Sequence, residues 1–183
     1  MLVKILIGVA IVVVILVIVI ATRPSTFRIE RSIKISAPPS SAFALVNDFH
    51  RWGVWSPWEK MDPNLERSYE GASSGQGSVY SWNGNKKVGQ GRMTIEQSRE
   101  NSKIVIKLEF LRPFKQTNTA TFTFTPEADG TMVRWAMDGR NNFLGKTFHM
   151  LIDMDKMVGK DFERGLTAMK EQAERDHSAV ARN

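Results

Sequence analysis

Cysteine is absent from this chain of 183 residues. Its absence excludes disulfides, thiolate metal sites and a cysteine nucleophile, and it leaves the redox compartment undetermined. Histidine is scarce as well: His50, His149 and His177 lie far apart, and none belongs to a metal-binding pattern. The chain also lacks a G-x-S-x-G motif. We therefore expect no metal, no cofactor and no nucleophilic catalytic residue.

Charge of one sign is not concentrated anywhere in the chain. The net charge is +6, and the 25 Lys and Arg residues are interspersed with 19 Asp and Glu residues. A nucleic-acid-binding protein would show a basic stripe with interleaved aromatic residues, and this pattern is missing. We expect no nucleic-acid partner, and the modest positive charge suits a domain tethered to an anionic membrane surface.

Only one long apolar run is present, at the start of the chain. No charged residue occurs from Ile5 to Ala21, and a helix of this length spans roughly 26 Å, close to the thickness of a bilayer core. The alternative is a cleaved signal peptide, but Ile20, Ala21 and Thr22 do not form an A-x-A cleavage pattern. We expect a single-pass membrane anchor. The sequence does not identify a protein partner.

The charges that flank this run predict its orientation. Lys4 precedes it, whereas Arg23, Arg28, Arg31 and Lys34 follow it. The flank richer in Lys and Arg usually stays in the cytoplasm. We therefore expect the globular domain on the cytoplasmic side.

After the anchor, the sequence alternates with the period of a strand. Residues 26–35 place Phe27, Ile29, Ile33 and Ile35 on one face, and residues 104–110 behave similarly. Between them, residues 37–49 suggest a short helix with Ser40 or Ser41 as its cap, followed by strand-like pieces at 65–71 and 78–97. Residues 118–139 predict a hairpin that turns at Ala128 to Gly130, with Ala120, Phe122 and Phe124 opposite Val133, Trp135 and Met137.

From Asn142 to about Asp176 the period changes to that of a helix. The residues that project onto one stripe are Leu144, Phe148, Leu151, Ile152, Val158, Phe162, Leu166 and Met169. The predicted class is α+β: a curved antiparallel sheet of about seven strands, wrapped on a long carboxy-terminal helix. We assign residues 1–22 to the anchor, 23–26 to a linker, 27–176 to the domain and 177–183 to a frayed tail. One helix is narrower than such a sheet, so we expect a cavity between them.

Three of the five tryptophans, Trp52, Trp55 and Trp58, lie within seven residues. Their spacing of three puts them on one side of a helical or 3₁₀ turn, which Gly53, Ser56 and Pro57 keep short. The rings either plug the end of the core or form an aromatic rim around a pocket, with interfacial contact to the bilayer as a variant of the rim. Other inward-facing aromatic residues are candidates for both core and pocket wall: Tyr80, Trp82, Phe110, Phe122, Phe124 and Trp135.

Two charged residues interrupt apolar faces. Asp155 projects onto the stripe of the last helix, and Arg31 lies on the apolar face of the first strand. They either pair with one another or provide the polar end of an apolar pocket. Gly159, on the same stripe, either permits close approach of helix and sheet or leaves room for a ligand.

The order of these pieces resembles a known superfamily. Residues 26–174 are similar to the SRPBCC superfamily, which includes START domains and the polyketide cyclase/dehydrase and lipid-transport group. The matching segments are "RSIKISAPPSSAFALVNDFHRWGVWSPWEKMDP", "GQGSVYSWNGN", "VGQGRMTI", "GTMVRWAMDG" and "MDKMVGKDFERGLTAMKEQAE". The resemblance implies a helix-grip fold with a deep hydrophobic pocket, but no single reaction.

The sequence supports three functional hypotheses. The first is a membrane-tethered protein that binds a hydrophobic small molecule or lipid between the sheet and the last helix. The second is a cyclase/dehydrase-like enzyme that uses pocket shape with Asp155 or His50 as acid or base. The third is a domain whose work is contact with another membrane protein. We prefer the first.

Overall fold

The computed structural model describes residues 1–141, 145–147, 153–180 and 182. An apolar helix, α1 (Leu2–Thr22), precedes the globular part. It is followed by a strand, β1 (Thr26–Ile35), a short helix, α2 (Pro39–Asn47), and two 3₁₀ turns, η1 (Phe49–Val54) and η2 (Pro57–Lys60). The remaining strands are β2 (Glu66–Gly71), β3 (Ser78–Asn83), β4 (Gln90–Arg99), β5 (Lys103–Arg112), β6 (Gln116–Glu127) and β7 (Gly130–Arg140). A long helix, α4 (Met154–Val180), ends the chain.

The strands form one curved antiparallel sheet, which confirms the predicted class. Its order is β1-β7-β6-β5-β4-β3-β2, so every pair except β1 with β7 joins neighbours in the sequence. The predicted hairpin is confirmed in its register, because Phe122 lies opposite Trp135 and Phe124 opposite Val133. The alternation of apolar residues sets this register, since a slip by one residue would expose them all.

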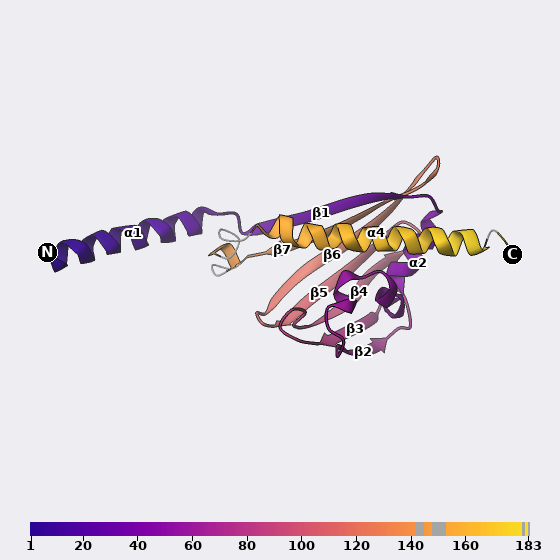
Figure 1. Cartoon of the computed structure of the whole chain (residues 1–183), viewed down its shortest axis with the longest axis horizontal. Helices are drawn as coiled ribbons and strands as arrows, with labels where there is room; N and C mark the ends of the chain where they lie inside the picture. The colour runs from indigo at the N-terminus through magenta and orange to yellow at the C-terminus, as the bar shows by residue number, and fades with distance from the viewer. Residues whose placement is uncertain (142–144, 148–152, 181, 183) are drawn as a thin grey trace.

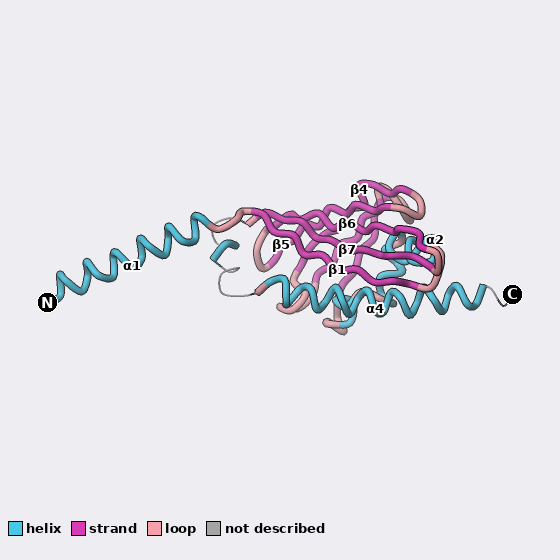
Figure 2. The backbone as a smooth tube through the Cα atoms, turned by 90° about the horizontal axis from the view of Figure 1, so that it is seen from above, coloured by secondary structure: helices cyan, strands magenta, loops and turns pink. Residues whose placement is uncertain are grey.

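The helices cover one face of the sheet unequally (Figures 1 and 2). α4 packs mainly along β1, at one edge, whereas α2 and the 3₁₀ turns lie over the middle strands. The predicted stripe of α4 is confirmed in its described part, where Phe162, Leu166 and Met169 are buried. Four other stripe residues lie outside the described residues: Leu144, Phe148, Leu151 and Ile152.

Two helix ends differ from the prediction. α2 begins after Pro38 without a side-chain cap, so the expected role of Ser40 or Ser41 was wrong. Proline at the start of a helix fixes a suitable φ and has no N–H that needs a partner, so no cap is required. α4 continues to Val180 instead of ending near Asp176, because polar contacts replace apolar ones there: Arg51 pairs with Asp176, and the Ser178 hydroxyl donates to the Glu174 carbonyl.

The two ends of the sheet are distinct. We call the end where β1 begins and β7 ends the α1 end, because α1 leaves the domain there (Figure 1). Since the strands are antiparallel, the turns β3–β4 and β5–β6 lie at this α1 end. The turns β2–β3, β4–β5 and β6–β7 lie at the opposite, far end.

Candidate functional site

The tryptophan segment packs against the sheet. Trp52 and Trp55 are 4% and 2% exposed, and their ring centroids are 4.7 Å apart. The indole N–H of Trp52 donates to the carbonyl of Val46, and that of Trp55 donates to the carbonyl of Leu45. Both rings are thus fixed by hydrogen bonds to α2 as well as by packing. This geometry is that of the plug, and not of a rim.

Trp58 belongs to a stack of rings beneath α4. Its ring meets those of Trp135 and Phe162 edge to face, at 5.6 and 6.2 Å, while Trp135 and Phe162 stack at 3.9 Å. Trp55 and Phe122 complete the stack around Trp135. Aromatic side chains thus fill the space between α4 and the sheet where the sequence predicted a cavity. Two shallow hollows on the described surface lie on α4 itself, along its charged residues.

Burial of the concave face decreases toward the α1 end along β3 and β5. At the far end, Ile35, Ile104 and Ile95 are completely buried. At the α1 end, the corresponding residues on the same face are only half-buried: Phe27, Trp82, Leu108 and Phe110. The concave face is therefore sealed at the far end, and solvent reaches it from the α1 end. We call the half-buried residues of the α1 end the opening.

Glycine and asparagine shape this opening. A Cβ on Gly91 would overlap the ring of Trp82, and a Cβ on Gly139 would overlap Phe27 and the amide of Asn118. The Asn118 amide is buried, and its Oδ1 accepts from Gln116 Nε2 at 3.0 Å. Among the described residues, its Nδ2 donates to the Met137 sulfur, at 3.6 Å, which is a weak acceptor. The opening therefore combines an apolar wall with one amide donor that is poorly satisfied.

A polar group lies beneath the opening at the η2 side. The Tyr80 hydroxyl donates to Glu59 Oε1 at 2.5 Å, and Arg67 Nε binds Glu59 Oε2 at 2.7 Å. The Glu59 side chain is 8% exposed, so both partners offset its burial. Burial, together with the bond to Glu59, raises the pKa of Tyr80 well above its usual range. The Glu59 carboxylate was missed in the sequence, because it stands in a short polar turn with no periodic signal.

Arg31 and Asp155 pair with one another. Arg31 Nη2 lies 3.0 Å from Asp155 Oδ2, and its Nε lies 2.8 Å from Glu163 Oε1. Hydrogen bonds to Asp155 and then to Glu163 raise the pKa of Arg31. The first of the two alternatives for these residues, pairing with one another, is thus the one observed, and the Asp155 side chain is more than half exposed. Gly159 faces the guanidinium, and its missing Cβ lets α4 approach β1.

The two described histidines, His50 and His177, do not converge on a site. The His50 ring stacks on Tyr69 at 4.1 Å, and its Nδ1 lies 2.9 Å from Asp48 Oδ1, on an exposed surface. His177 lies on α4, and His149 is outside the described residues. Among the described residues, no cluster of His, Asp and Glu could hold a metal ion.

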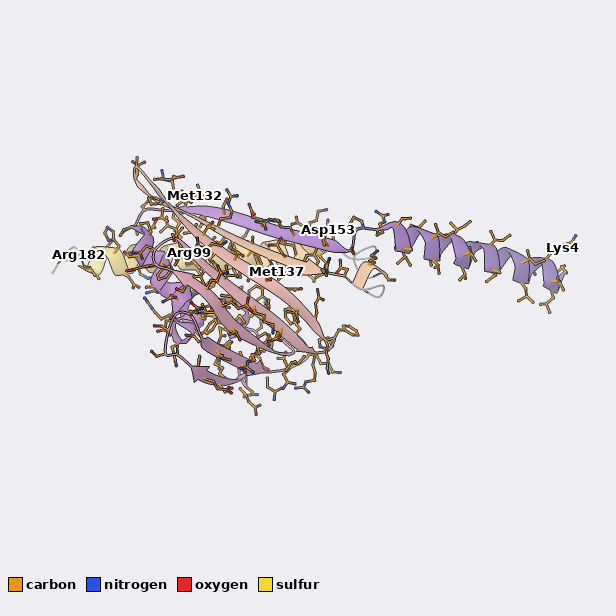
Figure 3. All side chains as sticks on the ribbon, turned by 180° about the vertical axis from the view of Figure 1, so that it is seen from behind. Lys4, Arg99, Met132, Met137, Asp153 and Arg182 are labelled. Atoms are coloured by element: carbon orange, nitrogen blue, oxygen red, sulfur yellow. The ribbon has the colours of Figure 1, made fainter. Side chains whose placement is uncertain are left out.

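Helix α1 stands apart from the globular part. By length and composition, it could cross a membrane. A signal sequence near the N-terminus meets the same criterion. Figure 3 shows its side chains projecting on all sides, with Lys4 at the tip and Asp153 near the junction with the domain. The Asn141 N–H donates to the carbonyl of Ser25, and Lys146 Nζ donates to that of Ala21.

Comparisons with known proteins agree with this architecture. A solved protein from Chromobacterium violaceum matches with a TM-score of 0.58 at 14% identity, covering 83% of this chain and 99% of its own. A protein of unknown function from Staphylococcus aureus matches at 0.61 and 12%, covering 82% and 95%. The di-domain ARO/CYC protein BexL, from the BE-7585A biosynthetic pathway, matches at 0.60 and 15%, covering 86% of this chain and 53% of its own. At these identities the likeness shows the fold alone.

A family model shows more than these structures. No curated protein matches the chain. The model described as polyketide cyclase / dehydrase and lipid transport matches residues 26–174, which is nearly the whole globular part. This match confirms the SRPBCC resemblance and leaves α1 outside the shared domain. The chain therefore belongs to the polyketide cyclase / dehydrase and lipid transport family.

Proposed function

We propose that the protein binds a hydrophobic small molecule or lipid at the opening, while α1 holds the domain at a membrane. The observation that carries the proposal is the gradient of burial along the concave face. Apolar side chains on the concave face are fully buried at the far end, whereas those at the α1 end are only half-buried. Covering them with an apolar ligand would gain roughly 25 cal/mol per Å² of buried surface.

The proposal divides the aromatic residues into two groups. Trp82 and Phe110 are half-buried at the opening, so they contact the ligand together with Leu108, whereas the half-buried Trp58 stays in the stack beneath α4. A second group is held by packing and forms the rigid wall behind them: Trp52, Trp55, Tyr80, Phe122 and Trp135. The amide of Asn118 offers a hydrogen bond to a polar group on the ligand.

Arg31 and Asp155 serve the fold in this proposal. Their charges are satisfied by one another, by Glu163 and by the carbonyl of Glu30. No donor of the guanidinium is left to orient a ligand. We propose that the pair holds α4 along β1 and thereby keeps the concave face at its width.

A second candidate is a cyclase-type reaction on the bound molecule. The observation that favours it is the Tyr80–Glu59–Arg67 group, in which a buried carboxylate holds a phenol proton. The Tyr80 hydroxyl has one proton, so it stabilises negative charge on a substrate oxygen only when that oxygen replaces Glu59 Oε1 as its acceptor. Under this alternative, Tyr80→Phe abolishes conversion of a bound polyketide-like compound and leaves its binding intact.

Native mass spectrometry of the full chain, extracted in mild detergent, tests the binding proposal. We expect an apolar molecule to co-purify at one copy per chain. Leu108→Trp fills the opening and should lower the occupied fraction about tenfold, because overpacking costs about 1–3 kcal/mol. The neighbouring Lys107→Trp is the matched control, since its side chain points to the other face of β5.

Two outcomes would contradict the proposal. One is an empty wild-type chain that stays empty after incubation with lipid extract. The other is equal occupancy in Leu108→Trp and Lys107→Trp, both folded by circular dichroism. Recovery of a defined protein partner with an empty domain would favour the third hypothesis, contact with another membrane protein.

A further inference from the structure

The α1 end of the sheet is held close to the end of α1. Only Arg23 to Ser25 separate the helix from β1, a span of roughly 10 Å at most. The hydrogen bonds from Asn141 to Ser25 and from Lys146 to Ala21 tie the linker to the domain. If α1 crosses a bilayer, the turns of the α1 end therefore lie near its surface. In Figure 1, the end of β5 and the starts of β6 and β1 lie on the side from which α1 leaves.

These turns carry positive charge. The β3–β4 turn contains Lys86 and Lys87, and the β5–β6 turn contains Lys115 beside Arg112. Arg140 at the end of β7 and Arg23 in the linker belong to the same end. Among the residues that the structure describes, Lys86, Lys87, Lys115 and Arg140 form no ion pair. Their charges are thus available to an external anion.

The same turns expose apolar side chains. Phe114 is 62% exposed and Leu111 is 45% exposed, in the turn that also carries Arg112 and Lys115. An apolar tip flanked by basic residues is the pattern of segments that enter the interface of a bilayer, where the apolar group is buried and the cations meet the headgroups.

The two turns form one continuous surface. Gly89 adopts φ +66 and approaches the backbone of Arg112 so closely that a Cβ would overlap its carbonyl oxygen. The Arg112 guanidinium donates to the Asn83 side-chain carbonyl on the other turn. The cations and the apolar tip therefore lie on the same surface, beside Trp82 and Phe110 of the opening.

The far end carries both signs of charge. Its β2–β3 turn, residues 72–77, is uncharged, and its other turns contain Glu100 and Asp129. Asp129 and Glu127 pair with Lys34, and Arg99 and Lys103 flank Glu100. Among the turns that join the strands, only those of the α1 end contain lysine.

From this placement we propose that the α1 end docks on the anionic lipid surface of the bilayer that α1 crosses, with Phe114 and Leu111 inserted among the headgroups. The inference rests on the proposed membrane role of α1 and adds an orientation to it. Docking points the opening at the lipid, so an apolar ligand passes between bilayer and protein without crossing water. The surface charges act over about 8 Å at physiological salt, which is close to the reach of the linker.

The cysteine-free chain allows a direct test. The full chain carrying Phe114→Cys is labelled with an environment-sensitive dye and reconstituted into vesicles of phosphatidylcholine with phosphatidylglycerol. The matched control is Asp129→Cys, whose side chain is 82% exposed in the β6–β7 turn at the far end. We expect a blue shift and quenching by brominated lipid at position 114 only.

Charge reversal tests the electrostatic part. Lys87→Glu and Lys115→Glu should each shift the equilibrium from docked to undocked roughly fivefold, and high salt should do the same. Lys103→Glu, at the far end of β5, is the matched control and should change nothing. Vesicles of phosphatidylcholine alone should also abolish the signal at position 114.

The outcomes separate the two proposals. Equal signals at positions 114 and 129, in a chain that resists alkaline carbonate extraction, overturn the docking and leave the anchor intact. Extraction by carbonate contradicts the anchor, and flotation of the same chain with the anionic vesicles then decides the docking. If the chain floats with the vesicles and Lys115→Glu weakens this flotation, the docking is supported. If the chain does not float, the docking is overturned.

Discussion

At the scale of single residues, Gly159 shows how a poor helix former can be required by its neighbour. The Arg31 guanidinium occupies the place where a Cβ would be, and it is held there by Asp155 and Glu163. Alanine gains about 1 kcal/mol over glycine inside a helix, but overpacking costs about 1–3 kcal/mol. The two effects oppose each other, and the fixed guanidinium makes the second larger.

We therefore predict that Gly159→Ala lowers the free energy of unfolding by about 1 kcal/mol, measured by urea denaturation of the full chain in detergent. In an Arg31→Ala background the same change should become neutral or stabilising, since the space is then free. Gly53→Ala, where a Cβ meets nothing within 4 Å, is the control. Equal effects of Gly159→Ala with and without Arg31 would show that the guanidinium is not the cause.

The second prediction concerns Tyr80 and the folding stability at alkaline pH. Its folded pKa is raised by burial and by Glu59, whereas an unfolded tyrosine titrates near pH 10. The unfolded state therefore releases a proton first, so the stability from Tyr80 is complete below about pH 10 and decreases as the pH rises above it.

Tyr80→Phe should lower stability by about 1 kcal/mol at neutral pH through the lost hydrogen bond, yet weaken its decline above about pH 10. Denaturant titrations at several alkaline pH values measure both effects. Tyr69 is the other tyrosine of the chain; its pKa is raised mainly by burial, and Tyr69→Phe serves as the comparison. Parallel pH profiles for the wild type and Tyr80→Phe would contradict the assignment.

At the scale of elements, periodicity determines what could be predicted. The alternation in residues 26–35 and 118–139 predicted β1, β6, β7 and their faces, because one side of each strand is buried. The 3.6-residue stripe likewise predicted the buried side of α4. The interruptions at Arg31 and Asp155 were noticed because each broke an otherwise regular face, and pairing with one another was one of the two alternatives predicted for them.

The position of α4 could not be predicted in the same way. A stripe tells which side of a helix is buried, but not which strand it meets, and α4 packs along β1 instead of over the middle of the sheet. The space over the middle is then taken by Phe49, Trp52 and Trp55, whose spacing of three predicted a short turn but not the strands that it covers. The opening escaped detection for a related reason: Gly91, Asn118 and Gly139 come together only through strand register.

At the scale of the whole molecule, the basic residues that predict the membrane orientation of α1 form ion pairs in the folded domain. Arg28 pairs with Glu30 and Asp138, Arg31 with α4, and Lys34 with the β6–β7 turn. If α1 crosses a membrane, the flank richer in Lys and Arg predicts a cytoplasmic domain. Arg23, outside the sheet, belongs to the same flank.

We accordingly predict that the domain faces the cytoplasm, and cysteine accessibility in intact bacterial cells measures this. A single Asp129→Cys should resist a membrane-impermeant maleimide until the cells are lysed, whereas Leu2→Cys on the other flank should react at once. Moving positive charge across α1, with Arg23→Glu and added lysines before Leu2, should raise the fraction of chains labelled at position 129. Labelling of Asp129→Cys in intact cells at the rate seen after lysis would place the domain outside. The docking surface would then meet the outer leaflet, and its dependence on anionic lipid would have to be measured there.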